Sequence, residues 1–176
     1  MAVATAVGLT LSAGVLYPTS AVATETIEMV ADLMPGGGGA EVRNLTAVGD
    51  SLFFTADDGT HGSELWKTDG TEAGTALVKD IKPGAASSYS SYLTAVGGTL
   101  FFAASDGTHG FELWKSDGTE AGTALVKDTN PTGGGFGYEL TPVDGTVFFE
   151  TFEGAHGYEL WKSDGTEAGT ALVKDI

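Results

Sequence analysis

The sequence predicts an all-β fold, β-propeller-like and open, with three four-stranded antiparallel blades and an extra N-terminal strand. Two observations lead to this prediction. The segment ELWKSDGTEAGTALVKD occupies 112–128 and again 159–175, and a third copy at 64–80 differs only at Thr68. The tryptophans of the three copies lie 48 and 47 residues apart. Such a period is typical of propeller blades, and also of some helical repeats.

The pattern inside one repeat indicates strands and not helices. The second copy reads LTAVGG, TLFFAASDG, FELWKSDG and TALVKD, with Asp-Gly or Gly-Gly punctuation between these β-prone runs. Each run lasts five to seven residues, and no window shows the apolar spacing of three and four that a helix needs. Four short strands in a repeat of this length predict a propeller blade.

The residue pattern of the middle strands indicates burial on both faces. Phe101-Phe102 and Leu113-Trp114 are apolar at consecutive positions, and the other copies repeat this. A sheet with one wet face would alternate polar and apolar residues instead. Asp106-Gly107 predicts the turn between the second and third strands, and 117–123 predicts a longer connection to the fourth. Each sheet is therefore expected to lie between two neighbours.

The motif Glu-Leu-Trp-Lys-Ser-Asp-Gly-Thr-Glu-Ala-Gly-Thr at 112–123 resembles the ELWxxDGT repeat family of bacterial secreted and surface proteins. The resemblance covers about residues 45–176 and rests on twelve positions in each copy. It implies a β-propeller-like, exported protein with several repeats. It implies no enzymatic activity, and no catalytic residue follows from it.

An uncharged segment rich in Ala and Val precedes the first charged residue, Glu25. Ala21-Val22-Ala23 has the A-x-A form that signal peptidase recognises, so we expect a signal peptide over 1–23 and a secreted or cell-surface location. The basic start of a typical signal is missing, and a transmembrane anchor is the alternative interpretation. Two glycines and a proline interrupt the apolar run, which favours the signal peptide.

The expected organisation is an N-terminal strand with a glycine-rich linker over 24–44, followed by repeats over about 45–92, 93–139 and 140–176. The stretch 26–36 resembles 76–84, the end of the first repeat, so it predicts a fourth strand without the three that should precede it. Three blades are fewer than the usual four to eight. Two interpretations remain: a fragment of a longer repeat protein, or two copies that complete one ring of six blades.

The charge balance limits the classes of partner. Eight Lys and Arg against 24 Asp and Glu give a net charge of −16, which argues against binding to nucleic acid. It also disfavours an anionic membrane surface once the signal peptide is removed. The chain has no cysteine, which excludes disulfides, thiolate metal sites and a cysteine nucleophile.

Each repeat carries one histidine before a glycine, in the loop between its second and third strands: His61, His109 and His156. Three related imidazoles are a candidate metal site, but this loop lies away from a propeller axis, so we predict a structural role in the turn. Loop carboxylates are candidate Ca²⁺ ligands, namely Asp57, Asp58, Asp69, Asp106, Asp117 and Asp164. Their spacing lacks the D-x-D alternation, so turn formation is favoured, and we assign no catalytic, cofactor or metal residue.

The glutamate of each ELW motif precedes a lysine by three positions. We therefore predict an ion pair inside each blade: Glu64 with Lys67, Glu112 with Lys115, and Glu159 with Lys162. A pair of catalytic carboxylates of the glycosidase type is the less favoured interpretation.

Residues present in all three copies are expected to serve blade geometry, because an active site needs groups placed once. Function is therefore expected where the copies differ: Arg43, Tyr89, Tyr92, Phe136, Tyr138, Glu139, Glu150 and Glu153. The aromatic residues among them are candidates for stacking on sugars or contacting a protein partner, and packing over a blade edge is the alternative. Asn44-Leu45-Thr46 fits a glycosylation sequon, which an exported bacterial protein would not use.

These features favour a secreted or cell-surface binding or scaffold module without catalytic activity, with a glycan or protein ligand. One alternative is part of a propeller hydrolase or lyase acting on extracellular polysaccharide, for which Glu150 and Glu153 are the candidate acids. Another is a structural adhesion repeat whose copies matter for spacing.

Overall fold

The computed structural model describes residues 27–131, 135–154 and 156–175. These residues form three four-stranded antiparallel sheets and no helix. The first sheet holds β1 (Arg43–Val48), β2 (Ser51–Asp57), β3 (Ser63–Thr68) and β4 (Ala76–Lys79). The second holds β5 (Ser91–Val96), β6 (Thr99–Ser105), β7 (Phe111–Ser116) and β8 (Ala124–Lys127). The third holds β9 (Gly135–Val143), β10 (Thr146–Glu153), β11 (Gly157–Ser163) and β12 (Ala171–Lys174).

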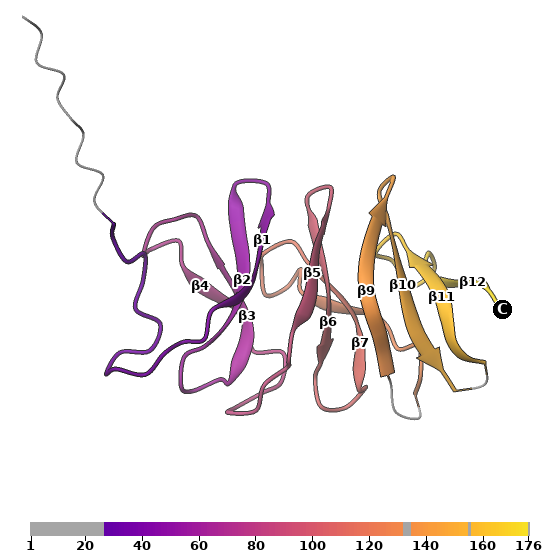
Figure 1. Cartoon of the computed structure of the whole chain (residues 1–176), viewed down its shortest axis with the longest axis horizontal. Helices are drawn as coiled ribbons and strands as arrows, with labels where there is room; N and C mark the ends of the chain where they lie inside the picture. Colours follow the sequence, from indigo (N-terminus) through magenta and orange to yellow (C-terminus); the bar gives the residue numbers. More distant parts are fainter. Residues whose placement is uncertain (1–26, 132–134, 155, 176) are drawn as a thin grey trace, which may run out of the picture.

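The three sheets stand side by side in a row (Figure 1). Within each sheet the strands follow one another in chain order, so every connection joins neighbouring strands. The first strands of consecutive sheets are in contact, β1 with β5 and β5 with β9. No sheet closes on itself. The all-β class and the four strands of each repeat are confirmed, and each sheet has the form of a blade.

The hydrophobic core lies between the sheets, as the two-faced apolar pattern predicts. Phe53 and Leu65 of the first sheet pack against Phe102 and Trp114 of the second. Equivalent residues of the second sheet, led by Phe101 and Leu113, pack against Phe149 and Trp161 of the third. Each sandwiched strand therefore buries one of its two adjacent apolar residues on each side.

The predicted N-terminal strand over 26–36 is wrong within the described chain, because residues 27–42 form no strand. Its first apolar residues are exposed, and Ile27 is fully exposed. A strand needs a neighbouring strand to pair with its N–H and C=O groups. The fourth strand of each sheet pairs with the third, and among the described residues no such strand lies free beside this segment. The flanking repeat begins slightly earlier than expected, since β1 starts at Arg43.

The segment before β1 nevertheless keeps the contacts of a repeat end. Leu33 packs on Phe54 and Trp66 of the first sheet, as Ile81 packs on the equivalent pair of the second. The carbonyl of Ala40 accepts the N–H of Asp57 at 2.8 Å, and Ser88 accepts that of Ser105 at 3.0 Å. The resemblance of the N-terminal segment to a repeat end is thus expressed in its packing, without the strand.

The loop from β7 to β8 explains why the repeated motif is so uniform. Asp117 Oδ1 accepts the backbone N–H of Thr119 at 2.8 Å and its hydroxyl at 2.7 Å. The same Thr119 hydroxyl accepts the N–H of Gly122 at 2.9 Å, and Thr123 donates to the Thr119 carbonyl at 2.7 Å. Ser116 and Thr123 hydroxyls join at 2.7 Å beneath the loop. The first and third copies repeat this network.

Gly122→Ala is expected to lower the free energy of unfolding by about 1–3 kcal/mol. A Cβ at this position would lie 2.1 Å from Asp117 Oδ1, so the carboxylate must leave the bonds that it makes to Thr119. Urea unfolding followed by tryptophan fluorescence measures the effect. Gly98→Ala is the control, because nothing lies within 4 Å of a Cβ there. Equal losses in the two variants would contradict a specific role of the loop.

Candidate functional site

The histidine of each repeat is bound by a carboxylate three residues before it, in the loop between the second and third strands. The ring Nδ1 to carboxylate oxygen distances are 2.7 Å for His61–Asp58, 2.7 Å for His109–Asp106 and 2.5 Å for His156–Glu153. This hydrogen bond raises the pKa of each imidazole. Asp58 Oδ1 also accepts the backbone N–H groups of Thr60 and His61, both at 2.8 Å. These contacts are those of a turn, the role that the sequence predicts.

The remaining loop aspartates also bond within their own turns. Asp57 Oδ1 accepts the N–H of Gly59 at 2.7 Å. In three turns, a hydrogen bond from the threonine two residues later lowers the pKa of the aspartate. These aspartates are Asp69, Asp117 and Asp164. The described residues include no group of three or more His, Asp or Glu around a common metal position. Turn formation, the role that the sequence favours over Ca²⁺ binding, accounts for the contacts that these loops make.

The predicted ion pairs between the ELW glutamates and the lysines are wrong in the first two repeats. Glu64 and Glu112 are buried, and their carboxylates accept backbone N–H groups of the following linker. Lys115 instead donates to the carbonyl of Gly165 in the third sheet at 2.7 Å. The reason is geometric: residues three apart on a strand point to opposite faces. Glu64 therefore shares a face with Trp66 and not with Lys67.

The buried glutamates connect each third strand to the linker after its sheet. Glu64 Oε1 accepts the N–H of Ser88 at 2.8 Å, and Oε2 accepts the N–H of Ile81 at 3.2 Å. Burial raises the pKa of Glu64 to about 7, against the lowering effect of these bonds. Glu112 Oε2 accepts the N–H and the hydroxyl of Thr129, and burial raises its pKa too. Its Oε1 is buried without a hydrogen-bond partner in the described chain.

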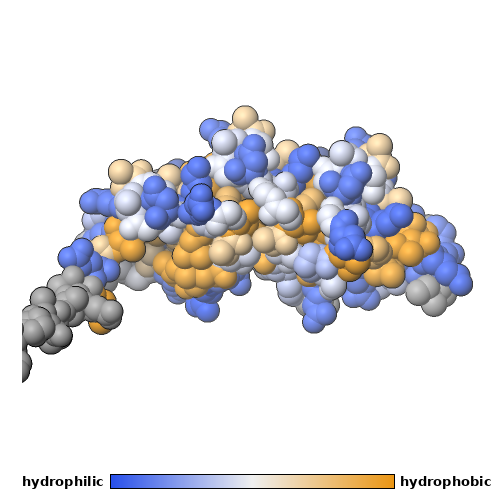
Figure 2. Space-filling view, turned by 90° about the horizontal axis from the view of Figure 1, so that it is seen from above, coloured by the Kyte–Doolittle hydropathy of each residue, from blue (hydrophilic) through white to orange (hydrophobic). Residues whose placement is uncertain are grey.

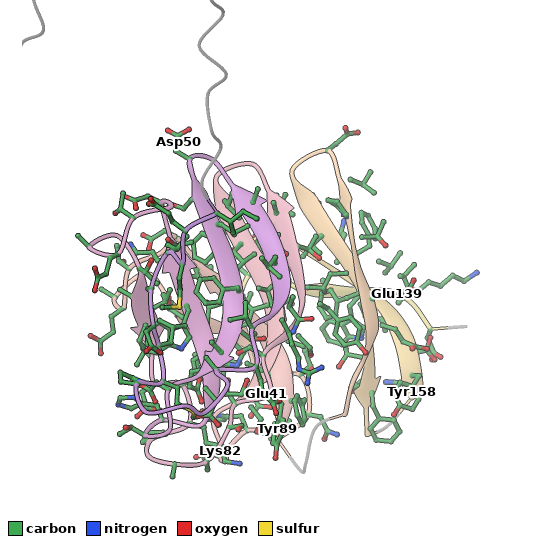
Figure 3. The ribbon with its side chains drawn as sticks, turned by 60° about the vertical axis from the view of Figure 1, so that its left-hand side comes forward. Glu41, Asp50, Lys82, Tyr89, Glu139 and Tyr158 are labelled. Atoms are coloured by element: carbon green, nitrogen blue, oxygen red, sulfur yellow. The ribbon has the colours of Figure 1, made fainter. Side chains whose placement is uncertain are left out.

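A polar cleft of about 450 Å³ opens between the first and second sheets, at the end where β1 begins. It brings together two of the residues at which the copies differ, Arg43 and Tyr89. The cleft is lined by Glu41, Arg43, Asn44, Thr55, Asp57, Ser63, Ser87, Tyr89 and Ser90. Figure 3 shows Glu41 and Tyr89 near one another at the same end of the molecule. Sequence comparison of the repeats found Arg43 and Tyr89 and missed the other side chains.

Side-chain bonds join the two sheets across this cleft. Asn44 Nδ2 donates to Thr55 Oγ1 and to the Ser90 carbonyl, both at 3.3 Å. Ser87 Oγ accepts the N–H of Ser63 at 2.9 Å. At the mouth, an exposed ion pair joins the Arg43 guanidinium to the Glu41 carboxylate at 3.2 Å. The walls are thus positioned by the fold, whereas the charges at the mouth face solvent.

Three residues that line the cleft have a strained backbone conformation. Non-glycine residues have positive φ at Glu41 (47°), Asn44 (56°) and Tyr89 (54°). The register of β1 with β2 shifts between Arg43 and Thr46, which places Asn44 in a bulge. Residues in such conformations cost about 1–3 kcal/mol each, and they are often found at functional sites. Tyr92 (55°) and Glu139 (72°) have the same conformation at the positions equivalent to Asn44, so this backbone geometry belongs to the repeat and does not single out the cleft.

Two aromatic pairs lie at the same end of the molecule as the cleft. The rings of Tyr89 and Phe111 are 6.4 Å apart, and the side chain of Tyr89 is 63% exposed. Phe152 and Tyr158 form an edge-to-face pair at 5.2 Å. Phe111 was missed by the sequence analysis, although a signal was present: equivalent positions hold Ser63 and Tyr158 in the other repeats. Tyr89 thus contacts the second sheet through Phe111 and keeps most of its surface in solvent, so both interpretations of the linker aromatic residues, ligand contact and packing on a sheet, stay open.

The other residues at which the copies differ do not join this cleft. Tyr92 lies in β5 and Glu139 in β9, both with positive φ, and Figure 3 shows Glu139 on the third sheet. Glu150 is exposed on β10, while Glu153 binds His156. Phe136 and Tyr138 belong to β9, and their side chains lie outside the described residues, as does the predicted signal peptide.

The chain matches no family model, no curated protein and no solved structure at a significant level. The resemblance to ELWxxDGT repeats therefore stays a prediction from the motif. Within the described residues no helix is long and apolar enough to cross a bilayer.

Proposed function

We propose that this protein is an exported, non-catalytic binding module whose three sheets are consecutive blades of a β-propeller, and that the cleft between the first two binds a neutral glycan. The observation that carries this proposal is the position of Tyr89, an exposed ring at the mouth of a polar cleft. An aromatic ring offers an apolar face for the C–H groups of a sugar, and its hydroxyl offers a hydrogen bond.

The lining of the cleft suits a ligand rich in hydroxyl groups. Glu41 and Asp57 supply carboxylate acceptors, and Asn44 and the serines supply neutral polar groups. The net charge of −16 disfavours acidic polysaccharides, so the proposed ligand carries no carboxylate or sulfate. Side chains held at the ends of a rigid sheet scaffold are a common arrangement for binding sites.

A hydrolase or lyase is less well supported by the described residues. The two candidate acids, Glu150 and Glu153, are three residues apart on β10 and so point to opposite faces of the strand. A glycosidase needs two carboxyl groups flanking one bond. Glu153 is also bound to His156 in its turn. These positions do not form a shared site for acid–base chemistry.

Screening the full chain on an array of neutral and acidic glycans tests the proposal. We expect binding to neutral glycans, and we expect Tyr89→Ala to weaken it by about tenfold or more, because central aromatic contacts commonly carry over 1 kcal/mol. Tyr158→Ala is the control, since Tyr158 is an exposed tyrosine of the third sheet, outside the cleft. The array is repeated with Ca²⁺ and with chelator. Absence of binding to any neutral glycan, or equal losses in the two variants, would overturn the proposal.

A further inference from the structure

The row of sheets is held together by one interface that occurs twice. Four apolar positions of the first sheet pack against the second, at Val48, Phe53, Leu65 and Val78. The equivalent positions of the second sheet pack against the third, at Val96, Phe101, Leu113 and Val126. In the third sheet these positions are Val143, Phe148, Leu160 and Val173, which we call the trailing face.

The trailing face is exposed although its residues match the two buried sets. Leu65 and Leu113 are 0% exposed, and the equivalent Leu160 is 41% exposed. Val173 is 43% exposed, against 4% for Val78. The backbone register is also the same, because each leucine pairs with the corresponding lysine of the fourth strand. The third sheet thus presents the surface that a following sheet covers elsewhere in this chain.

The opposite end of the row presents the complementary surface. The first sheet carries Leu45, Leu52 and Thr75, which we call the leading face. Leu45 is 60% exposed, whereas its third-sheet equivalent Leu140 is buried by the preceding sheet at 9%. An apolar hollow of about 170 Å³ is lined here by Leu45, Leu52 and Phe54 together with Val30, Ala31 and Leu33 of the N-terminal segment. Leu33 packs on Phe54 and Trp66 as Ile81 packs inside the first internal interface. Figure 2 shows hydrophobic surface towards both ends of the row.

Polar contacts define the register of the two internal interfaces. Lys79 Nζ donates to the Thr123 carbonyl at 3.1 Å, and Lys127 Nζ donates to that of Thr170 at 3.1 Å. Thr46 and Thr94 hydroxyls donate to the carbonyls of Leu93 and Leu140, at 3.2 and 3.5 Å. The third copies of these donors are Lys174 and Thr141, in the third sheet. The acceptors equivalent to these in the first repeat are the carbonyl groups of Thr75 and Leu45, on the leading face.

We propose that the trailing face of one copy of this chain binds the leading face of a second copy, head to tail, in the register of the internal interfaces. The chain itself identifies the partner. In both internal interfaces, the residues equivalent to the trailing face pack against those equivalent to the leading face of the next sheet. Such a contact is heterologous: it joins two different patches and either closes a ring or extends a row. In this register Lys174 meets the carbonyl of Thr75 of the second copy, and Thr141 meets that of Leu45.

Sedimentation velocity of the full chain over a range of concentrations tests the association. We expect concentration-dependent dimers or longer rows, and we expect Leu160→Lys to weaken them by about tenfold or more, because a buried leucine contributes about 1.5–3 kcal/mol. Tyr158→Lys is the matched control. It places a lysine on the same strand face, two residues away. Its equivalent in the second sheet, Phe111, is still 36% exposed with the third sheet in place, so this position contributes less to the interface. A chain that is monomeric at every concentration, or equal losses in both variants, would overturn the proposal.

Cysteine cross-linking tests the register separately from the strength of association. The chain has no cysteine of its own, and both Thr141 and Leu45 are exposed. A Thr141→Cys chain mixed with a Leu45→Cys chain should form covalent heterodimers with a short bismaleimide. Each variant alone should form none. Cross-linking within either single variant, or none in the mixture, would exclude the head-to-tail register.

Discussion

Leu113→Ala is expected to lower the free energy of unfolding by about 2–5 kcal/mol, and Leu160→Ala by less than about 1 kcal/mol. The two leucines occupy equivalent positions on β7 and β11 of almost identical sequence. They differ in what covers them. Leu113 is fully buried against the third sheet, whereas Leu160 is 41% exposed. Removing a buried leucine loses transfer free energy and leaves a cavity, and an exposed leucine loses little of either.

Equilibrium unfolding in urea, at a protein concentration low enough to keep the chain monomeric, measures this difference. Near-ultraviolet circular dichroism confirms that the variants are folded, and a Leu113→Ala chain already unfolded without urea counts as the upper end of the range. Equal costs at the two positions would contradict the order of the sheets, because the same substitution would then be made in equal surroundings.

The contribution of Glu64 to the free energy of unfolding is expected to fall by about 3 kcal/mol as pH rises from 4.5 to about 7. Burial raises the pKa of Glu64 from its ordinary 4.5 to about 7 in the folded protein. Between these values the folded chain holds a proton that the unfolded chain has released. Stability is therefore fully present below pH 4.5 and is lost as pH rises through about 7.

Comparing the wild-type chain with Glu64→Gln between pH 4 and 8 isolates this contribution. The variant cannot ionise at this position, so its stability should decline less over that interval. The raised pKa values of the histidines also remove stability as pH rises. His109 and His156 contribute equally to both chains, whereas the pKa of His61 is raised in small part by the Glu64 charge that the variant removes. Glu150→Gln, on an exposed position of β10, is the control. Parallel pH profiles for wild type and Glu64→Gln would show that the pKa of Glu64 is the same in the folded and unfolded chain, which contradicts the prediction.

The local structure of each repeat could be predicted from the sequence because it depends on short-range chemistry. Short β-prone runs and Asp-Gly turns locate β2 and β3 to within a few residues, and adjacent apolar residues indicate burial on both faces. The role of Asp117 and Thr119 follows likewise from turn chemistry. The prediction of a strand over 26–36 is wrong because a strand pattern cannot show whether a partner edge is present.

The position of the ELW glutamates shows a second kind of limit. Proximity in sequence suggested an ion pair between Glu64 and Lys67, whereas the strand period places them on opposite faces. That Glu64 is buried and bound by Ile81 and Ser88 depends on where the linker crosses the sheet. The pKa of this carboxyl group is therefore a property of the tertiary structure.

The sequence by itself determined the fold class, the repeat, the strands of each sheet and the list of positions at which the copies differ. Only the tertiary structure decided that Arg43 and Tyr89 meet across one cleft while Glu139 and Glu150 lie elsewhere. It also decided that the identical leucines of the repeats differ in exposure. The physical reason is that strands and turns form from neighbours in the chain, whereas clefts and open faces depend on which sheets stand side by side.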